Sequence, residues 1–192
     1  MKRNYVLLAT NTYLYECFTN AFHRFDNVKV HLGIFEQLEQ IDCLVSPANS
    51  FGLMDGGMDA AITNYFGDQL QKRVQEHIIN EYYGEQPIGT SFIVETNNER
   101  IKYLAHSPTM RIPKIIKNTD NVYMATKATL IAIDKFKEKI DTVAFPAFGA
   151  GCGQVHPVDV AYQMSLAFKH FENPPKTIDW NFARFRDYEI LK

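Results

Sequence analysis

Apolar stretches rich in β-branched residues recur along the chain and predict a series of β-strands. Short runs of this kind, bounded by polar or glycine-containing segments, are typical of strands. The candidate strands are Tyr5 to Ala9, Val28 to Phe35, Asp42 to Ser46, Thr90 to Glu95, Ile101 to His106 and Thr142 to Pro146. Because only Asn97-Asn98-Glu99 separates the fourth run from the fifth, we predict that these two strands form an antiparallel hairpin.

Between the strands, apolar residues recur at steps of three and four, a spacing that predicts helices with one buried face. The stripes are Leu70, Val74 and Ile78; Val122, Ala125, Ala128 and Ala132; and Ala161, Met164, Phe168 and Phe171. Pro157 stands at the expected first position of the last helix, where its missing N–H breaks no intrahelical hydrogen bond.

Alternating strands and helices indicate the α/β class, and we predict a three-layer αβα sandwich with a central mixed β-sheet. The chain has 192 residues, which suits a single domain of ordinary size. We therefore predict one domain over residues 1–192, with residues 174–192 as a C-terminal tail packed on it. The side chains expected to make that contact are Trp180, Phe182, Phe185 and Tyr188.

Composition and charge narrow the classes of function. With 20 basic and 22 acidic side chains, the formal net charge is -2, so the chain lacks the positive field of a nucleic-acid-binding protein. No apolar run approaches the ~20 residues that a membrane span requires. The cysteines, Cys17, Cys43 and Cys152, fit neither a disulfide framework nor a metal knuckle, which favours a reducing, cytoplasmic location. We expect no metal, cofactor, nucleic-acid partner or membrane partner.

The stretch from Asp42 to Ile62 reads as strand, glycine-containing loop and helix. In such a unit the helix directs its N-terminal N–H groups and positive dipole end toward a ligand at the strand's carboxyl end. Gly56 and Gly57 let the backbone approach that ligand closely. Phosphate groups suit this position, although a tight turn before a helix explains the glycine pair equally well.

A second loop, from Phe145 to Gln154, also follows an expected strand and precedes an expected helix. Its three glycines alternate with other residues, which leaves backbone amides free to form an anion-binding concavity. Two such loops at strand ends can hold a diphosphate between them. Neither loop contains the lysine-containing phosphate-binding motif of nucleotide hydrolases or the glycine fingerprint of dinucleotide dehydrogenases. Both of these classes of protein are therefore disfavoured.

These motifs resemble those of the macro domain family. The run VSPANS (45–50) followed by DGGMDAAI (55–62) is similar to the family's "NAAN" turn, glycine cluster and "VDGAI". The run PAFGAG (146–151) is similar to its "PALGTG" loop, and AHSP (105–108) occupies the place of its "HAVGP" segment. Order and spacing match from about Val28 to Phe171, which is most of the chain.

The resemblance implies an αβα sandwich that binds ADP-ribose, with the two loops holding the diphosphate and the distal ribose. It places Asn49 at the asparagine that contacts the distal ribose, and Asp59 at the acid that assists hydrolysis in the MacroD-type branch. A carboxylate there orients or deprotonates a water, or stabilises positive charge as the glycosidic bond loosens. The candidate catalytic residues are thus Asp59 and Asn49. The candidate ligand-binding residues are Ala48, Ser50, Asp55, Gly56, Gly57, Met58, Pro146, Phe148, Gly149, Ala150, Gly151, Cys152 and Gly153.

Three positions depart from the family pattern. Ile34 stands in place of the adenine-contacting aspartate, and Ser46 stands where the first motif has its leading asparagine. Cys152-Gly153 replaces the aromatic residue that often follows the second loop. Stacking on the distal ribose is therefore expected to be lost, or to come from Phe51 or Phe148.

The main site candidates also have structural alternatives. An acid such as Asp59 in a first helical turn is stabilised by the macrodipole whatever its function, and Asn49 can shape a turn through its side-chain amide. Cys152 is a conceivable nucleophile, although the sequence shows no base beside it. His106 and His156 are alternative acid or base groups, or simply hydrogen-bonded side chains.

We expect an enzyme that hydrolyses a bond at the distal ribose: an ADP-ribosyl hydrolase, or a phosphatase or esterase acting on an ADP-ribose derivative. The sequence leaves four substrates open: ADP-ribosylated protein, an acetylated ADP-ribose, ADP-ribose 1″-phosphate and another NAD-derived nucleotide. Two other classes remain open, namely a non-catalytic module that reads ADP-ribose and an interaction domain that has lost its ligand.

Overall fold

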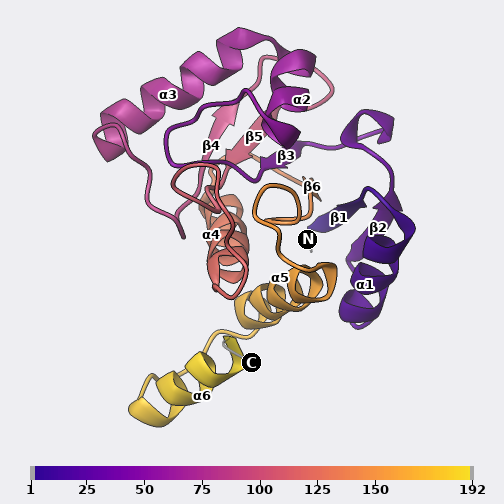
Figure 1. Ribbon diagram of the computed structural model, residues 1–192, viewed down its shortest axis with the longest axis vertical. Coiled ribbons are helices and arrows are strands. Elements are labelled where there is room, and N and C mark those ends of the chain that lie inside the picture. Colours follow the sequence, from indigo (N-terminus) through magenta and orange to yellow (C-terminus); the bar gives the residue numbers. More distant parts are fainter. Residues whose placement is uncertain (1–2, 191–192) are drawn as a thin grey trace.

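A computed structural model describes residues 3–190, and in it helices cover both faces of one six-stranded sheet (Figure 1). The strands are β1 (Asn4–Ala9), β2 (Val28–Leu32), β3 (Cys43–Ser46), β4 (Phe92–Glu95), β5 (Tyr103–His106) and β6 (Thr142–Phe145). The helices are α1 (Thr12–Phe22), α2 (Gly57–Phe66), α3 (Asp68–Tyr82), α4 (Asn121–Lys135), α5 (Pro157–Glu172) and α6 (Trp180–Ile190), with a 3₁₀ turn, η1 (Phe35–Gln37). The predicted α/β class is confirmed.

The sheet has the order β2-β1-β6-β3-β5-β4. All neighbouring strands are parallel except β4 and β5, which form the predicted antiparallel hairpin, with Phe92 opposite His106. The sheet is therefore mixed, as predicted. The carboxyl ends of β1, β3, β5 and β6 meet at one edge, which is where open α/β sheets bind their ligands.

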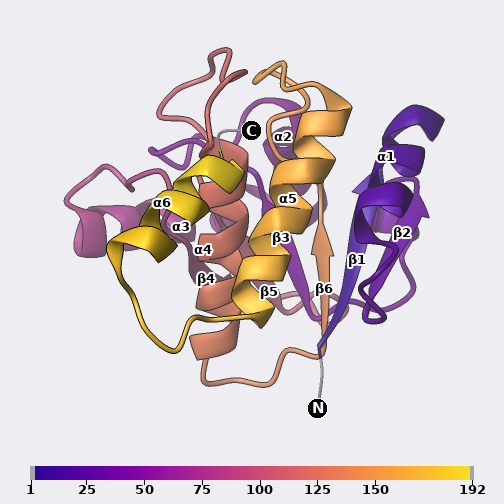
Figure 2. The same ribbon diagram turned by 90° about the horizontal axis from the view of Figure 1, so that it is seen from below.

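Successive strand residues point to opposite faces of the sheet and so build two hydrophobic cores. Leu7 and Val45 lie in the core that α1, α4 and α5 cover, whereas Leu8 and Leu44 lie in the core that α2 and α3 cover. Figure 2 shows the sheet between these layers. This arrangement is the predicted αβα sandwich.

The helix starts follow local capping chemistry. Helix α5 begins at Pro157, as predicted, and α2 begins at Gly57, which puts Asp59 in its first turn. Helix α1 goes beyond the predicted elements. The side chain of Asn11 caps it by accepting a hydrogen bond from the amide of Leu14 at 2.9 Å.

The second predicted strand is shorter than expected, because β2 ends at Leu32 rather than at Phe35. The amide of Gly33 still donates to the carbonyl of Ala9 at 2.9 Å, and the chain then turns into η1. Phe35 is buried in the core beneath α2, where its ring contacts the rings of Tyr65 and Phe66. Burial of this ring stabilises the turn relative to a continued strand.

The buried face of α4 differs from the predicted stripe. Val122 and Ala125 are buried as expected, but Ala128 and Ala132 are only half-buried. Thr126 and Thr129 face inward instead, since each hydroxyl donates to a backbone carbonyl four residues earlier at 2.7 Å. The polar group of each threonine is thereby satisfied inside the core.

The C-terminal helix contacts the rest of the fold through different residues than predicted. Trp180, Phe185 and Tyr188 are exposed, so the expectation that these rings make the contact is wrong. Figure 1 shows α6 in yellow below α5. Near the end of α6, Glu189 makes an ion pair with Lys169 of α5 at 2.7 Å, and its other carboxylate oxygen lies 3.1 Å from Nε2 of His170. These polar contacts and the packing of Ile190 against the buried cluster that contains Leu166 attach the end of α6, and of the four predicted contact residues only Phe182 is half-buried.

The proposed domain limits at residues 1 and 192 lie outside the described residues and stay a prediction, as does the separate tail at 174–192. Within residues 3–190, no helix is both long and apolar enough to cross a membrane.

Candidate ligand-binding and active site

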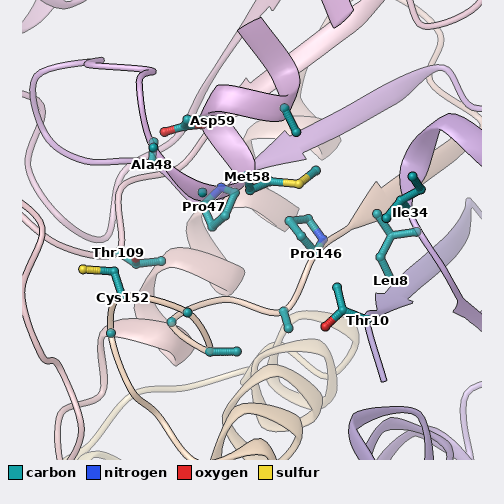
Figure 3. Close-up of a pocket in the computed structure, with 18 of the residues that line it drawn as sticks. Leu8, Thr10, Ile34, Pro47, Ala48, Met58, Asp59, Thr109, Pro146 and Cys152 are labelled. Atoms are coloured by element: carbon teal, nitrogen blue, oxygen red, sulfur yellow. The ribbon is translucent and has the colours of Figure 1, made fainter. Parts of the chain in front are cut away.

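A cavity of about 680 Å³ opens at the carboxyl edge of the sheet (Figure 3). Its walls come from the segments that follow β1, β2, β3, β5 and β6. The predicted site residues that line it are Ala48, Asn49, Asp55, Gly56, Gly57, Met58, Asp59, Pro146, Gly149, Ala150, Gly151, Cys152 and Gly153. The fold thus brings the two glycine loops to one cavity, as the sequence predicts.

The cavity has two ends with different chemistry, as Figure 3 shows. At one end lie Asp59, Ala48, Thr109 and Cys152, and at the opposite end lie Leu8, Thr10 and Ile34, with Pro47, Met58 and Pro146 between them. One end therefore carries the Asp59 carboxylate, whereas the segments at the other end line the cavity with both apolar residues, Leu8 and Ile34, and polar ones, Thr10, Asn11 and Glu36.

Two predicted ligand-binding residues, Ser50 and Phe148, do not line the cavity. Ser50 is buried, and its amide donates to the carbonyls of Met110 and Arg111, each at 3.1 Å. Phe148 is fully buried in the core and packs near the ring of Phe145. Both were predicted from their place in a motif, but they support the loops from behind.

The proposed aromatic substitutes for ribose stacking are also wrong. Phe148 is in the core, and Phe51 does not line the cavity either. The Phe51 ring instead lies 5.9 Å from the guanidinium of Arg111, which is paired with Glu85 at 2.6 Å. Among the described residues that line the cavity, the one aromatic residue is Phe35, which is buried in the core beneath α2.

The first wall of the cavity is the N-terminus of α2. Gly57 has a φ of +55°, a conformation that favours glycine, and a Cβ added to Gly56 or Gly57 would meet no atom within 4 Å. The N–H groups of a first helical turn have no intrahelical acceptor, and they carry the positive end of the helix dipole. This wall therefore presents unpaired donors to an anionic ligand.

The second wall is the loop from Pro146 to Gly153. Within residues 3–190, no acceptor is found for the amides of residues 147–153. The loop keeps its shape because the amides of Gln154 and Val155 donate back to the carbonyls of Gly151 and Gly149 at 3.0 and 3.1 Å. Consecutive free amides of this kind form an anion-binding concavity.

The side chain of Asn49 is already engaged within its own loop. Its Oδ1 accepts from the amides of Phe51 at 3.0 Å and Leu53 at 3.3 Å, and its Nδ2 donates to the carbonyl of Leu53 at 2.7 Å. The structure therefore shows the turn-forming role. A catalytic role for Asn49 stays a prediction.

Asp59 is the most chemically distinct group of the cavity. It is only 6% exposed, and the Ser46 hydroxyl donates a hydrogen bond to its Oδ1. Burial raises the pKa of this carboxyl to about 6; the Ser46 hydrogen bond opposes the shift, and the charge of Asp55 adds to it. A carboxyl that gains and loses a proton near neutral pH suits general acid–base chemistry.

Neither of the two histidine alternatives lines the cavity. His106 is fully buried with its Nδ1 2.6 Å from Oε1 of Gln86, and burial lowers its pKa to about 3, so that it stays neutral. The Nδ1 of His156 accepts from the amide of Val158 at the start of α5.

The exposed Cys152 does line the cavity. No group of acidic, histidine and cysteine residues in the described part of the chain is placed to hold a metal.

Several lining residues were not predicted. They are Leu8, Thr10, Asn11, Leu14, Gly33, Ile34, Phe35, Glu36, Pro47, Leu53, Ala61, Thr109, Met110, Pro113, Ala147 and Pro157. The segments after β1, β2 and β5 contribute many of them, and the rule that found the two glycine loops applies to those strand ends as well. The missing information was which strands are neighbours in the sheet.

A cavity at the carboxyl ends of parallel strands, with a helix N-terminus on one side and free amides on the other, is typical of α/β domains that bind phosphate groups. The family model for the Macro domain matches residues 45–164, which include both glycine loops. The chain belongs to the macro domain family.

Similar proteins support this assignment. A protein of Aquifex aeolicus (strain VF5) is 31% identical over 153 residues, which cover 80% of this chain and 86% of that protein. The macrodomain of Mycobacterium tuberculosis DarG is similar in fold, with a TM-score of 0.62 at 20% identity over 73% of this chain and 88% of that chain. The Oceanobacillus iheyensis macrodomain with ADP has a TM-score of 0.59 at 20% identity, over 82% and 86%. A mutant of the same Oceanobacillus domain has been solved with ADPR.

Proposed function

We propose that this protein binds ADP-ribose, or a compound that carries it, and hydrolyses a bond at the distal ribose. The observation that carries the hydrolytic part is the buried Asp59 carboxyl at one end of a cavity whose walls present unpaired amides. The binding part is supported by family membership and by the ADP and ADPR complexes of the Oceanobacillus macrodomain.

The proposed ligand spans the cavity from end to end. Its diphosphate lies between the N-terminus of α2 and the loop 146–153, where amide donors and the helix dipole favour negative charge. The adenosine lies toward Leu8 and Ile34, and the distal ribose lies toward Asp59. Adenine recognition then has no aspartate at position 34, and the neighbouring lining residues offer apolar contacts from Leu8 and Ile34 and polar groups from Thr10, Asn11 and Glu36.

In the proposed reaction, Asp59 accepts a proton as the oxygen of a water adds to the anomeric carbon of the distal ribose. The bond between that carbon and the linking oxygen breaks, and Asp59 passes the proton on to that oxygen of the leaving group, which returns the carboxyl to its ionised form. For an ADP-ribosylated protein the products are ADP-ribose and the released side chain, and for ADP-ribose 1″-phosphate they are ADP-ribose and phosphate; an acetyl ester on a ribose hydroxyl would instead need the water to add to the acyl carbon. A pKa of about 6 leaves most of Asp59 ionised at pH 7.5 and ready to act as the base.

A reader that binds without turnover is the second candidate, and the contacts of Asn49 favour it. An asparagine whose amide is used three times within its own loop has little left to offer a reacting ribose. Asp59 would then serve only to start α2, as an acid in the first turn of a helix often does. Turnover, rather than binding, separates the two functions.

The proposal predicts that Asp59→Asn keeps ADP-ribose affinity within about threefold of wild type but loses at least ~100-fold of turnover, the scale of general acid–base catalysis. Calorimetric titration of ADP-ribose measures the first, and release of ADP-ribose from an ADP-ribosylated protein measures the second. The matched control is Asp68→Asn, because Asp68 is exposed, stands in the first turn of α3 and does not line the cavity. It should behave as wild type in both assays.

Each other outcome has a definite meaning. Binding without turnover in the wild-type protein supports the reader, and full turnover in Asp59→Asn removes Asp59 from the mechanism. Absence of ADP-ribose binding contradicts the whole proposal.

A further inference from the structure

Ser46 is a buried serine that contacts the proposed catalytic carboxylate although sequence reasoning gave it no role. It is the last residue of β3, is fully buried, and does not line the cavity. The sheet fixes its backbone, since Ser46 pairs in register with His106 of β5 and its carbonyl accepts from the amide of Ser107 at 3.1 Å. Its hydroxyl therefore projects from a rigid strand.

The hydrogen bond from Ser46 to Asp59 joins two elements that the loop 47–56 separates. Ser46 stands at the end of β3, and Asp59 stands in the first turn of α2. A bond anchored in the sheet fixes the direction of the carboxylate relative to the cavity better than one from a mobile loop side chain. Because Oδ1 takes this bond, Oδ2 is left for water or substrate.

The hydroxyl also affects which protonation state Asp59 adopts. A hydroxyl that donates to a carboxylate stabilises its charged form. Burial and the negative charge of Asp55, on the loop before α2, both raise the pKa of Asp59, whereas the Ser46 hydrogen bond lowers it. Ser46 thus opposes the two effects that would leave the carboxyl protonated at neutral pH.

We propose that Ser46 is a positioning residue that holds Asp59 by Oδ1, so that an ionised and correctly directed Oδ2 accepts the proton of the attacking water. The catalytic part of this inference rests on the proposed function. The effect of Ser46 on the ionisation of Asp59 does not, and it can be measured in the protein without substrate.

The test compares three variants of the full chain. Ser46→Ala removes the hydroxyl, Ser46→Thr keeps it, and Ser107→Ala is the matched control. Ser107 is also fully buried at the carboxyl edge of the sheet, but its hydroxyl bonds to Ser91 at 2.8 Å and Thr129 at 2.7 Å rather than to Asp59. Thermal melting of each variant reports any general loss of stability.

The first readout is titration of the Asp59 carboxyl by carbon NMR, with Asp59→Asn used to assign the signal. In Ser46→Ala the titration midpoint should rise by about one pH unit, since a hydrogen bond to a charged group is lost. In Ser46→Thr and Ser107→Ala it should stay near the wild-type value. An unmoved midpoint in folded Ser46→Ala overturns the proposal.

The second readout is the pH dependence of turnover. In Ser46→Ala the acid limb of the kcat profile should shift to higher pH by as much as the Asp59 titration midpoint does. KM and ADP-ribose affinity should change by less than about threefold. Ser46→Thr should have the wild-type profile. Equal losses in Ser46→Ala and Ser107→Ala would overturn the positioning role and indicate general destabilisation. If the wild-type protein has no turnover, the proposed function fails, whereas the NMR titration still decides whether Ser46 controls the charge of Asp59.

Discussion

Asp59 combines features that favour chemistry at the expense of stability. It lies in the first turn of α2, where the helix dipole favours its charge, yet burial in the cavity wall disfavours that charge and raises its pKa to about 6. The folded protein therefore holds a proton on Asp59 more tightly than the unfolded chain, for which the ordinary pKa is 3.8. Such a raised pKa stabilises the fold below about pH 4, and that contribution is lost as the pH rises through 6.

This sign predicts that Asp59→Asn, which stays neutral at every pH, is more stable than wild type at pH 7.5 and nearly equal to it at pH 4. The difference between 3.8 and about 6 corresponds to at most about 3 kcal/mol in the free energy of unfolding. Urea unfolding at several pH values measures it, with Asp68→Asn as the control for loss of an exposed acid. A stability difference that does not change with pH would contradict the assigned pKa.

Residue-level prediction from the sequence worked where a motif fixes the backbone and failed where it depends on packing. The ten-residue spacing from Asn49 to Asp59 put both residues at the cavity. The motif could not show that Phe148 faces the core rather than the cavity, because neighbouring residues of a loop need not share a face. Nor could it show the bond from Ser46 to Asp59, because the pair is 13 residues apart and on different elements.

At the scale of elements, the two glycine loops have different requirements for folding and for binding. A Cβ on Gly153 would lie 2.6 Å from the carbonyl oxygen of Gly149, so Gly153 is needed for the loop itself. Gly151 has open space around it, and Gly57 has open space but a φ of +55°. Gly57 and Gly151, like Gly56, are thus positions where a side chain can block the cavity without meeting the core.

We therefore predict that Gly151→Glu melts within about 2 °C of wild type but loses at least ~100-fold of ADP-ribose affinity, because its carboxylate clashes with and repels the diphosphate. Gly57→Glu should lose affinity similarly and also lose about 1 kcal/mol of stability from its positive φ. Gly84→Glu is the matched control, since Gly84 has a φ of +96°, open space and no contact with the cavity. Calorimetry and thermal melting measure both effects, and normal binding by Gly57→Glu and Gly151→Glu would refute the two-wall site.

Most strands and helices could be predicted because their apolar spacing is regular. Helix α1 also has regular spacing, with Leu14, Phe18 and Phe22 buried at four-residue steps. Its polar and aromatic residues between those positions hide the pattern. The prediction of which α4 residues face inward is wrong, because threonine hydroxyls can bond to carbonyls of the same helix, and such threonines are then buried as alanines are.

At the scale of the whole molecule, strand order creates the site. Strands β3 and β6 are neighbours in the sheet although about a hundred residues of chain separate them, and this pairing brings the two glycine loops to one cavity. Local periodicity carries no information about such pairings, so the resemblance to macro domains supplied it. Where that resemblance gives no guidance, as in the tail, the predicted contacts of Trp180, Phe185 and Tyr188 are wrong.

The central claim is that ADP-ribose lies between the two amide walls with its distal ribose at Asp59, and a crystal structure of the complex tests it most directly. The account predicts the diphosphate on the amides of α2 and the loop 146–153, adenine near Ile34, and the anomeric carbon within one water of the Asp59 carboxylate. A ligand bound in the reverse direction, or with its distal ribose away from Asp59, would contradict it.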